Sequence, residues 1–208
     1  IIYSNKSIGS DRISDQNWPD ILLNPEVRYG HSDPNSDPCG YRTLLSWKLA
    51  EKYYNRPGLY HLLDESRPKK NIRPKEVDLL ALLDVGELDY VFIYRSVAEQ
   101  HGYSYIVLPD EINLKSSAFE SFYKEVSVEI TGAKPGEKIV RKGAPIVYGI
   151  TIPKSAQSPQ WAARFVAFVL GPKGQKIMEA NGQQAFVPAR VDNYNNLPNL
   201  LKPLIKKE

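Results

Sequence analysis

The sequence has few of the residues that build covalent cross-links and metal sites. Its 208 residues include one cysteine, Cys39, and three histidines. A single cysteine excludes an internal disulfide and any site that needs several thiolate ligands. The histidines His31, His61 and His101 share no short spacing of the kind that metal ligands show, so each is interpreted as a surface or packing residue.

Long apolar runs and concentrated positive charge are also missing. No stretch of about 18 apolar residues occurs, so no transmembrane helix is predicted. The net charge is only +3, and the basic residues are spread along the chain apart from short pairs at 69–70 and 206–207. A nucleic-acid-binding protein usually gathers its basic residues on one face. We therefore predict no nucleic-acid partner.

Hydrophobic residues, at 42%, are numerous enough to build a core in one domain or in two lobes. The chain opens on "IIYSNKS", which is typical of the inside of a strand, and does not begin with methionine. We expect a fragment or a processed product whose native N-terminus, with any signal or anchor, lies upstream.

Strand and helix patterns alternate along the chain. Strands are expected within residues 1–4, 26–32, 88–96, 104–109 and 145–153, with a surface hairpin or loop at 132–144. Helices are expected within residues 14–25, 41–55, 73–87 and 158–182, the last broken at Gly171-Pro172. The helical apolar face of the last pair would hold Trp161, Phe165, Phe168 and Val169. The alternation predicts an α/β fold with largely parallel sheets.

The loop "SDPNSDPCGYRT" precedes a helix that we expect to begin near Gly40 or Tyr41. The first N–H groups of a helix have no partner inside it, and its dipole makes that end positive, so an anion could bind there. Gly40 would let a ligand approach the backbone closely. The alternative is that Asp37 simply caps the helix. A nucleophilic Cys39 would need a base, and only His31 is near in sequence, so a backbone N–H contribution is favoured.

Two later residues fit the same pattern. Glu76 would lie in the first turn of the next helix, where a carboxylate ordinarily opposes the dipole. Tyr94 lies near the end of a strand, where a tyrosine commonly belongs to the core. Their order along the chain is nevertheless that of a ligand cleft, because ligands in open α/β sheets bind beyond the carboxyl ends of the strands.

At these residues the sequence resembles a known family. The stretches "NWPDILLNPEVRYGHSDPNSDPCGYRTLLSWKLAEKYY" and "IRPKEVDLLALLDVGELDYVFIYRSVAEQHG" are similar to the molybdate/tungstate-binding proteins of ABC transporters, in their archaeal-type branch. "YKEVSVEITG" and the region after residue 144 extend the resemblance over nearly the whole chain. "DPCGYRT" and "GELDYVFIYRSVAEQHG" are its specific motifs.

The resemblance implies a periplasmic-binding-protein type II fold, in which two α/β lobes close on an oxyanion. By motif, Asp37 and Glu76 would be carboxylate ligands to the tungsten or molybdenum centre, the backbone around Pro38 and Cys39 would donate to the anion, and Tyr94 would hydrogen-bond it. The family further implies an extracytoplasmic monomer that delivers tungstate or molybdate to an ABC permease. Neither catalysis nor a cofactor is implied, and the membrane would be reached only through the permease or an anchor outside this sequence.

Two carboxylates beside a dianion should repel it, at a cost of several kcal/mol in water-poor surroundings. The arrangement makes sense if the carboxylate oxygens bind the central atom. Tungsten or molybdenum in the +6 state can expand from four oxygens to six, whereas sulfur in sulfate cannot. The pair would then attract the correct anion and reject sulfate and phosphate by like charge.

The sequence departs from the family in length. Family members carry an N-terminal stretch with two serine-containing loops that contact the anion, and no match to it is present. We therefore expect residues 9–144 to form the second lobe nearly whole. Residues 1–8 and 145–208 would supply the crossing strand and the remaining part of an incomplete first lobe.

Three alternatives stay open at this point. The same fold could serve as an oxyanion-sensing regulatory domain, which an upstream DNA-binding segment would reveal. A metal-dependent hydrolase could use Asp37, Glu76 and His31, although it would need a divalent metal and a general base. The chain could also be a truncated lobe without function.

Overall fold

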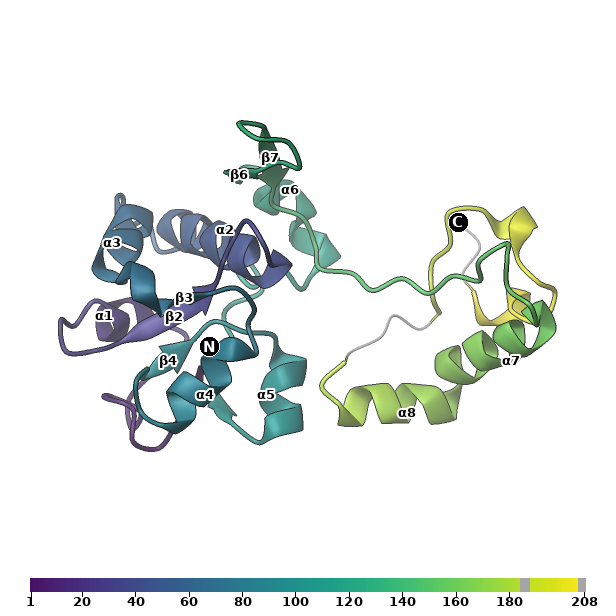
Figure 1. Cartoon of the computed structure of the whole chain (residues 1–208). Coiled ribbons are helices and arrows are strands. Elements are labelled where there is room, and N and C mark those ends of the chain that lie inside the picture. The colour runs from purple at the N-terminus through teal and green to yellow at the C-terminus, as the bar shows by residue number, and fades with distance from the viewer. Residues whose placement is uncertain (184–187, 206–208) are drawn as a thin grey trace. The chain divides into compact units, whose positions relative to one another are not determined.

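A computed structural model describes residues 1–183 and 188–205 and divides the chain into two compact units, Ile1–Val147 and Tyr148–Glu208 (Figure 1). Within the described residues, none of the helices has both the length and the apolar character needed to cross a membrane.

The first unit is built on a five-stranded sheet in the order β3-β2-β4-β1-β5. Strand β2 (Tyr29–Ser32) pairs in parallel with β3 (Ile72–Arg73) and with β4 (Tyr90–Val91). Strand β1 (Ile2–Tyr3) pairs antiparallel with β4 and with β5 (Ser104–Tyr105). Four strands thus run in one direction and β1 runs against them, which confirms the predicted α/β class and its largely parallel sheet.

Helices cover both faces of this sheet (Figure 1). One side carries α1 (Trp18–Leu22), α2 (Pro38–Tyr53) and α3 (Leu59–Ser66), and the other carries α4 (Asp78–Asp84) and α5 (Arg95–His101). Adjacent residues of a strand point to opposite faces. In β4, Tyr90 accordingly joins the core under α1–α3, whereas Val91 joins the core under α4 and α5.

Trp47 lies at the centre of the larger core and is fully buried. Its ring makes edge-on contacts with Tyr29, His31 and Phe92, with ring centroids 5.2–6.2 Å apart. Such aromatic pairs stabilise by about 0.5–1.5 kcal/mol each beyond the area they bury. The aromatic cluster therefore holds α2 firmly against β2 and β4.

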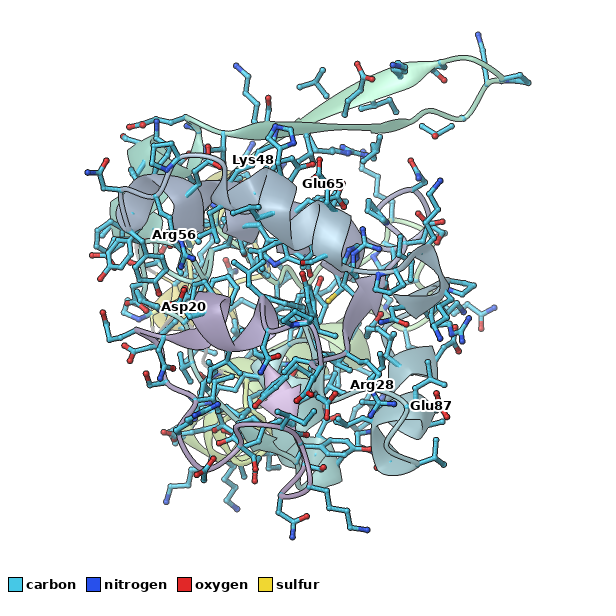
Figure 2. The ribbon with its side chains drawn as sticks, turned by 90° about the vertical axis from the view of Figure 1, so that its left-hand side faces the viewer. Asp20, Arg28, Lys48, Arg56, Glu65 and Glu87 are labelled. Carbon is cyan, nitrogen blue, oxygen red and sulfur yellow. The ribbon has the colours of Figure 1, made fainter. Side chains whose placement is uncertain are left out.

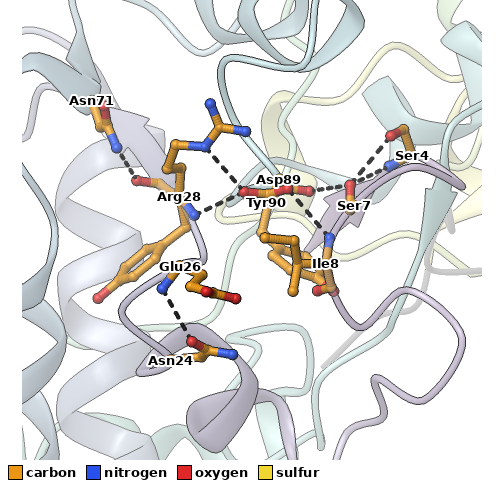
Figure 3. A network of polar contacts seen from close by, with 10 residues as sticks. Ser4, Ser7, Ile8, Asn24, Glu26, Arg28, Asn71, Asp89 and Tyr90 are labelled. Atoms are coloured by element: carbon orange, nitrogen blue, oxygen red, sulfur yellow. Dashed lines mark hydrogen bonds and ion pairs between the residues drawn. The ribbon is translucent and has the colours of Figure 1, made fainter.

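The buried carboxylate of Asp89 ties the N-terminal segment to the sheet (Figure 3). Asp89 Oδ2 accepts from the backbone N–H of Arg28 at 2.9 Å, and Oδ1 accepts from the N–H of Ile8 at 3.2 Å. The carbonyl of Asp89 accepts from Ser7 Oγ at 2.6 Å. A buried charge is stable only when it is paired or hydrogen-bonded, so this network fixes how the first residues enter the fold.

The remainder of the first unit is a hairpin and its support. Strands β6 (Ser127–Thr131) and β7 (Lys138–Lys142) pair antiparallel, which confirms the predicted hairpin and places the turn between them. The first unit also contains the short helix α6 (Glu120–Tyr123) and the 3₁₀ helices Lys69–Asn71 and Ser117–Phe119. The 3₁₀ helices Tyr194–Asn196 and Lys202–Leu204 belong to the second unit.

The second unit contains α7 (Pro159–Leu170) and α8 (Pro172–Ala180), and the break at Gly171-Pro172 is where the sequence predicts it. The predicted apolar face of α7 is wrong as a buried face. Trp161 and Phe165 are 68% and 62% exposed, and the residues buried on α7 are Ala163 and Val166.

Residues 145–153 form no strand, so that prediction is also wrong. A strand needs a neighbour to satisfy its backbone N–H and C=O groups, and this segment pairs with none of the described strands. Several of its apolar side chains remain open to solvent instead: Val147 is 64% exposed and Tyr148 is 69% exposed.

Two helix starts differ from the prediction. Helix α2 begins at Pro38 rather than near Gly40 or Tyr41, because proline already has the backbone angle of a first helical residue and needs no N–H there. Helix α4 begins at Asp78, well after Pro74. The Asp78 carboxylate accepts from the N–H of Lys75 at 3.1 Å, a local bond that holds the preceding residues in a turn.

Candidate functional site

The three residues singled out in sequence follow three neighbouring parallel strands. Asp37 follows β2, Glu76 follows β3 and Tyr94 follows β4. Because parallel strands present their carboxyl ends at one edge of the sheet, the topology brings the three residues together. The loop after β2 is fastened to the segment after β3, since Ser36 Oγ donates to the carbonyl of Pro74 at 2.9 Å.

Asp37 is the residue that joins these segments. Its Oδ1 accepts from the N–H of Cys39 at 2.9 Å, which makes it the N-cap of α2 and confirms the capping interpretation. Its Oδ2 accepts from the backbone N–H of Glu76 at 2.9 Å. One carboxylate therefore caps α2 and also holds the turn before α4 against the start of α2.

The carboxyl groups of Asp37 and Glu76 lie close enough to shift each other's pKa. Burial favours the neutral form of Asp37, but hydrogen bonds from the Glu76 carboxyl and from the N–H groups of Cys39 and Glu76 outweigh it and lower the pKa of Asp37. The same contact with Asp37, together with burial, raises the pKa of Glu76. The pair thus divides its roles: Asp37 is the ionised partner and Glu76 retains a proton more readily.

Cys39 and Pro38 supply neither a reactive thiolate nor a free backbone N–H. Burial, and then the negative charges of Asp37 and Glu76, raise the pKa of the Cys39 thiol, so the nucleophilic thiolate is disfavoured. The thiol lies 3.7 Å from the carbonyl oxygen of Phe92. The N–H of Cys39 is donated to Asp37, and Pro38 has no N–H to offer. These two residues shape the start of α2.

Tyr94 is the N-cap residue of α5, and its hydroxyl oxygen accepts from Arg42 Nη1 at 2.6 Å. Burial, and next the proximity of Cys39, raise the pKa of Tyr94, so its proton is retained and can be donated. Asp37 also acts electrostatically on this hydroxyl and adds to the rise in its pKa.

Gly40 allows a close approach between the start of α2 and the backbone that follows β2. A Cβ at Gly40 would lie 2.2 Å from the carbonyl oxygen of Ser32 and 2.7 Å from the backbone of Asp33 and Pro34. Such distances are far below van der Waals contact. The start of α2 consequently lies directly on the end of β2, which only glycine permits.

Sequence reasoning missed Ser32 and Arg42. Ser32 Oγ is fully buried and makes no hydrogen bond of normal geometry, yet it lies close enough to Asp37 and Cys39 to lower the pKa of both. Its signal was a polar residue ending a buried strand. Arg42 gave a similar signal, as a charged residue two positions before the apolar Leu44 of α2.

His31 does not belong to this group. It is fully buried, packs edge-on against Trp47 with ring centroids 5.2 Å apart, and its Nδ1 lies 2.6 Å from the carbonyl oxygen of Ser32. Within residues 1–183 and 188–205, no cluster of three or more His, Cys, Asp or Glu side chains is placed to hold a metal ion. The geometry therefore gives no support to a hydrolase that combines His31 with Asp37 and Glu76.

The structure thus places a capped helix entrance, two neighbouring acidic residues and a tyrosine hydroxyl at the carboxyl edge of an α/β sheet, where ligands of such sheets bind. The sequence profile of the bacterial extracellular solute-binding protein family matches residues 5–184, and the chain belongs to this family. The family is one of binding proteins, and the resemblance identified in the sequence is confirmed.

Individual relatives are similar over nearly the whole chain. An uncharacterized solute-binding protein of Petrotoga mobilis is 51% identical over 206 residues, covering 99% of this chain and 64% of the relative. The molybdate/tungstate-binding protein WtpA of Pyrococcus abyssi is 40% identical over 227 residues, with 99% and 64% covered. WtpA of Thermococcus kodakarensis is 41% identical over 210 residues, with 92% and 58% covered. The chain thus spans less than two thirds of the length of these relatives.

Proposed function

We propose that this protein captures tungstate or molybdate outside the cytoplasmic membrane and delivers it, as a monomer, to an ABC permease. The observation that carries the proposal is the contact between Asp37 and Glu76 at the start of α2. Asp37 Oδ2 lies 2.9 Å from the backbone nitrogen of Glu76. The names of the relatives from Pyrococcus and Thermococcus support the choice of anion. No cofactor is required for binding of this kind.

In this proposal each residue has a separate task. Carboxylate oxygens of Asp37 and Glu76 approach the central metal atom, which tungsten and molybdenum permit by expanding their coordination. Tyr94 donates its hydroxyl proton to an oxygen of the anion. The positive end of the α2 dipole, at Pro38 and Cys39, offsets part of the negative charge of the carboxylates. Sulfate offers no expandable centre, so it experiences only the repulsion.

We also propose that residues 9–144 form the second lobe, and that residues 145–208 belong to a first lobe whose other part corresponds to the unmatched length of the relatives. Two features support this assignment: the unpaired, apolar segment 145–153, and the exposed Trp161 and Phe165 of α7. Strand β1 would be the crossing strand, although its hydrogen bonds lie within the sheet of the first unit.

Tryptophan quenching tests the lobe assignment. Of the three tryptophans, Trp18 and Trp47 are fully buried and Trp161 is 68% exposed. Supplying the unmatched part of the Petrotoga relative as a separate polypeptide is expected to lower acrylamide quenching severalfold, because Trp161 becomes covered. A Trp161→Phe variant should show no such decrease. Unchanged quenching with the added polypeptide in excess would contradict the assignment.

Calorimetric titration with sodium tungstate, molybdate and sulfate tests the function, on the 208-residue chain alone and with the same added polypeptide. Binding of the first two anions and no heat with sulfate are expected. The Asp37→Asn/Glu76→Gln variant should lose at least about a hundredfold in tungstate affinity, since two charge-based contacts at about 1.5–3 kcal/mol each disappear. The side-chain amide introduced by Asp37→Asn retains an oxygen that can cap α2, so the fold is preserved.

The matched control changes two carboxylates away from the site. Glu65 and Glu87 are exposed on the first unit (Figure 2), and the Glu65→Gln/Glu87→Gln variant alters the net charge by the same amount. Its tungstate affinity should stay within twofold of the parent. Sulfate binding as tight as tungstate binding, or undiminished tungstate binding by the Asp37/Glu76 variant, would refute the proposed function.

A further inference from the structure

The side chain of Arg42 reaches the site without a carboxylate partner among the described ion pairs. It extends from the second turn of α2, is partly buried, and donates from Nη1 to the Tyr94 hydroxyl oxygen at 2.6 Å. Its Cζ lies 5.8 Å from the centroid of the Tyr94 ring and 5.7 Å from that of Tyr41. A partly buried guanidinium beside two aromatic rings and one hydroxyl keeps its positive charge.

The direction of the hydrogen bond determines what Tyr94 can do. Arginine has only donors, so the tyrosine oxygen must accept in this contact. A phenol has one proton, and its own donation is therefore directed elsewhere. Asp37 lies close enough to this hydroxyl to act on it electrostatically. Without Arg42, the Asp37 carboxylate could accept the tyrosine proton and remove it from the ligand.

We propose that Arg42 is a positioning residue that presents the Tyr94 hydroxyl to the oxyanion as a donor. This inference rests on the proposed function, because it assigns a further residue to the same site. Arg42 acts through Tyr94, so removing Arg42 matters only while the tyrosine hydroxyl is present.

A double-mutant cycle tests the proposal. It is measured on whichever sample binds tungstate in the titration above, either the chain alone or the chain with the added polypeptide. Arg42→Met is expected to weaken sodium tungstate binding about tenfold, the effect of one charge-assisted hydrogen bond. In a Tyr94→Phe background the same change should cost less than twofold. Arg42→Lys, which keeps a donor and the charge, should restore part of the affinity. Arg141→Met is the matched control, because Arg141 lies 5.8 Å from the Tyr41 ring centroid and outside the proposed site.

The outcomes separate the two claims. An equal loss in the wild-type and Tyr94→Phe backgrounds would overturn the positioning role, since Arg42 would then act on the anion directly. Unchanged affinity in Arg42→Met would overturn it as well. Thermal unfolding without anion measures the Arg42–Tyr94 contact independently. It is carried out on the parent, Arg42→Met, Tyr94→Phe and the double variant. Non-additive effects of the two substitutions on thermal unfolding would establish the contact itself. If the parent also failed to bind tungstate, the proposed function and the inference built on it would both be refuted.

Discussion

Replacing Gly40 by alanine is expected to lower the free energy of unfolding of the first unit by about 3 kcal/mol, the upper part of the range for overpacking. The sign is informative, because glycine-to-alanine changes inside helices ordinarily stabilise by up to about 1 kcal/mol. Here the added methyl would lie 2.2 Å from the Ser32 carbonyl oxygen and 2.7 Å from two further backbone atoms. Backbone cannot rotate away as a side chain can, so α2 must shift relative to β2.

Chemical denaturation, followed by the fluorescence of the buried tryptophans, measures this effect. The control is Gly149→Ala, because a Cβ at Gly149 meets no atom within 4 Å. That variant should change stability by less than about 0.5 kcal/mol. A Gly40→Ala protein as stable as the parent would show that α2 does not lie directly on the end of β2. The shift should also separate Asp37 from the Glu76 N–H and weaken tungstate binding.

Acidification is expected to destabilise the first unit through His31. Burial, and then the positive charge of Arg67, lower the pKa of His31 from 6.5 to about 4. In the unfolded chain His31 takes up a proton below pH 6.5, whereas the folded protein resists protonation until about pH 4. The contribution of His31 to the free energy of unfolding is therefore complete above about pH 6.5 and declines as the pH falls, by about 2 kcal/mol at about pH 5 and about 3 kcal/mol near pH 4.

Unfolding free energies at about pH 7 and about pH 5 give this slope directly. A His31→Gln variant should lose most of it, whereas His61→Gln, at an exposed position, should retain it. Nuclear magnetic resonance of the His31 ring supplies a second measurement that needs no variant, because the ring should stay neutral at about pH 5 in the folded protein. A His31 ring that titrates near its ordinary pKa of about 6.5 in the folded state would contradict the prediction.

Most elements of the first unit could be read from local sequence. The apolar period of α2 and the turn-rich residues between β6 and β7 are short-range signals, and they agree with the structure. The failure at residues 145–153 has a different origin. An alternating apolar pattern shows that a segment can form a strand, but a strand also needs a partner. That partner is a property of the tertiary structure.

The candidate site was predictable only in part. Asp37, Glu76 and Tyr94 were found because each follows a strand or begins a helix, positions that concentrate ligand contacts in α/β proteins. Arg42 was missed because its hydrogen bond reaches Tyr94, on a different element and distant in sequence. The double use of Asp37, as a cap and as the acceptor of the Glu76 N–H, was hidden for the same reason.

The sequence by itself determined the class of this protein: an α/β chain with one cysteine, no metal-ligand spacing and two specific motifs of an oxyanion-binding family. These features depend on residue type and on neighbours along the chain. Only the tertiary structure decided that Asp37 accepts from the N–H of Glu76, that Cys39 is a buried thiol and that Arg42 donates to Tyr94. Burial and contacts between side chains depend on distances between strands β2, β3 and β4, and those distances exist only after the sheet has formed.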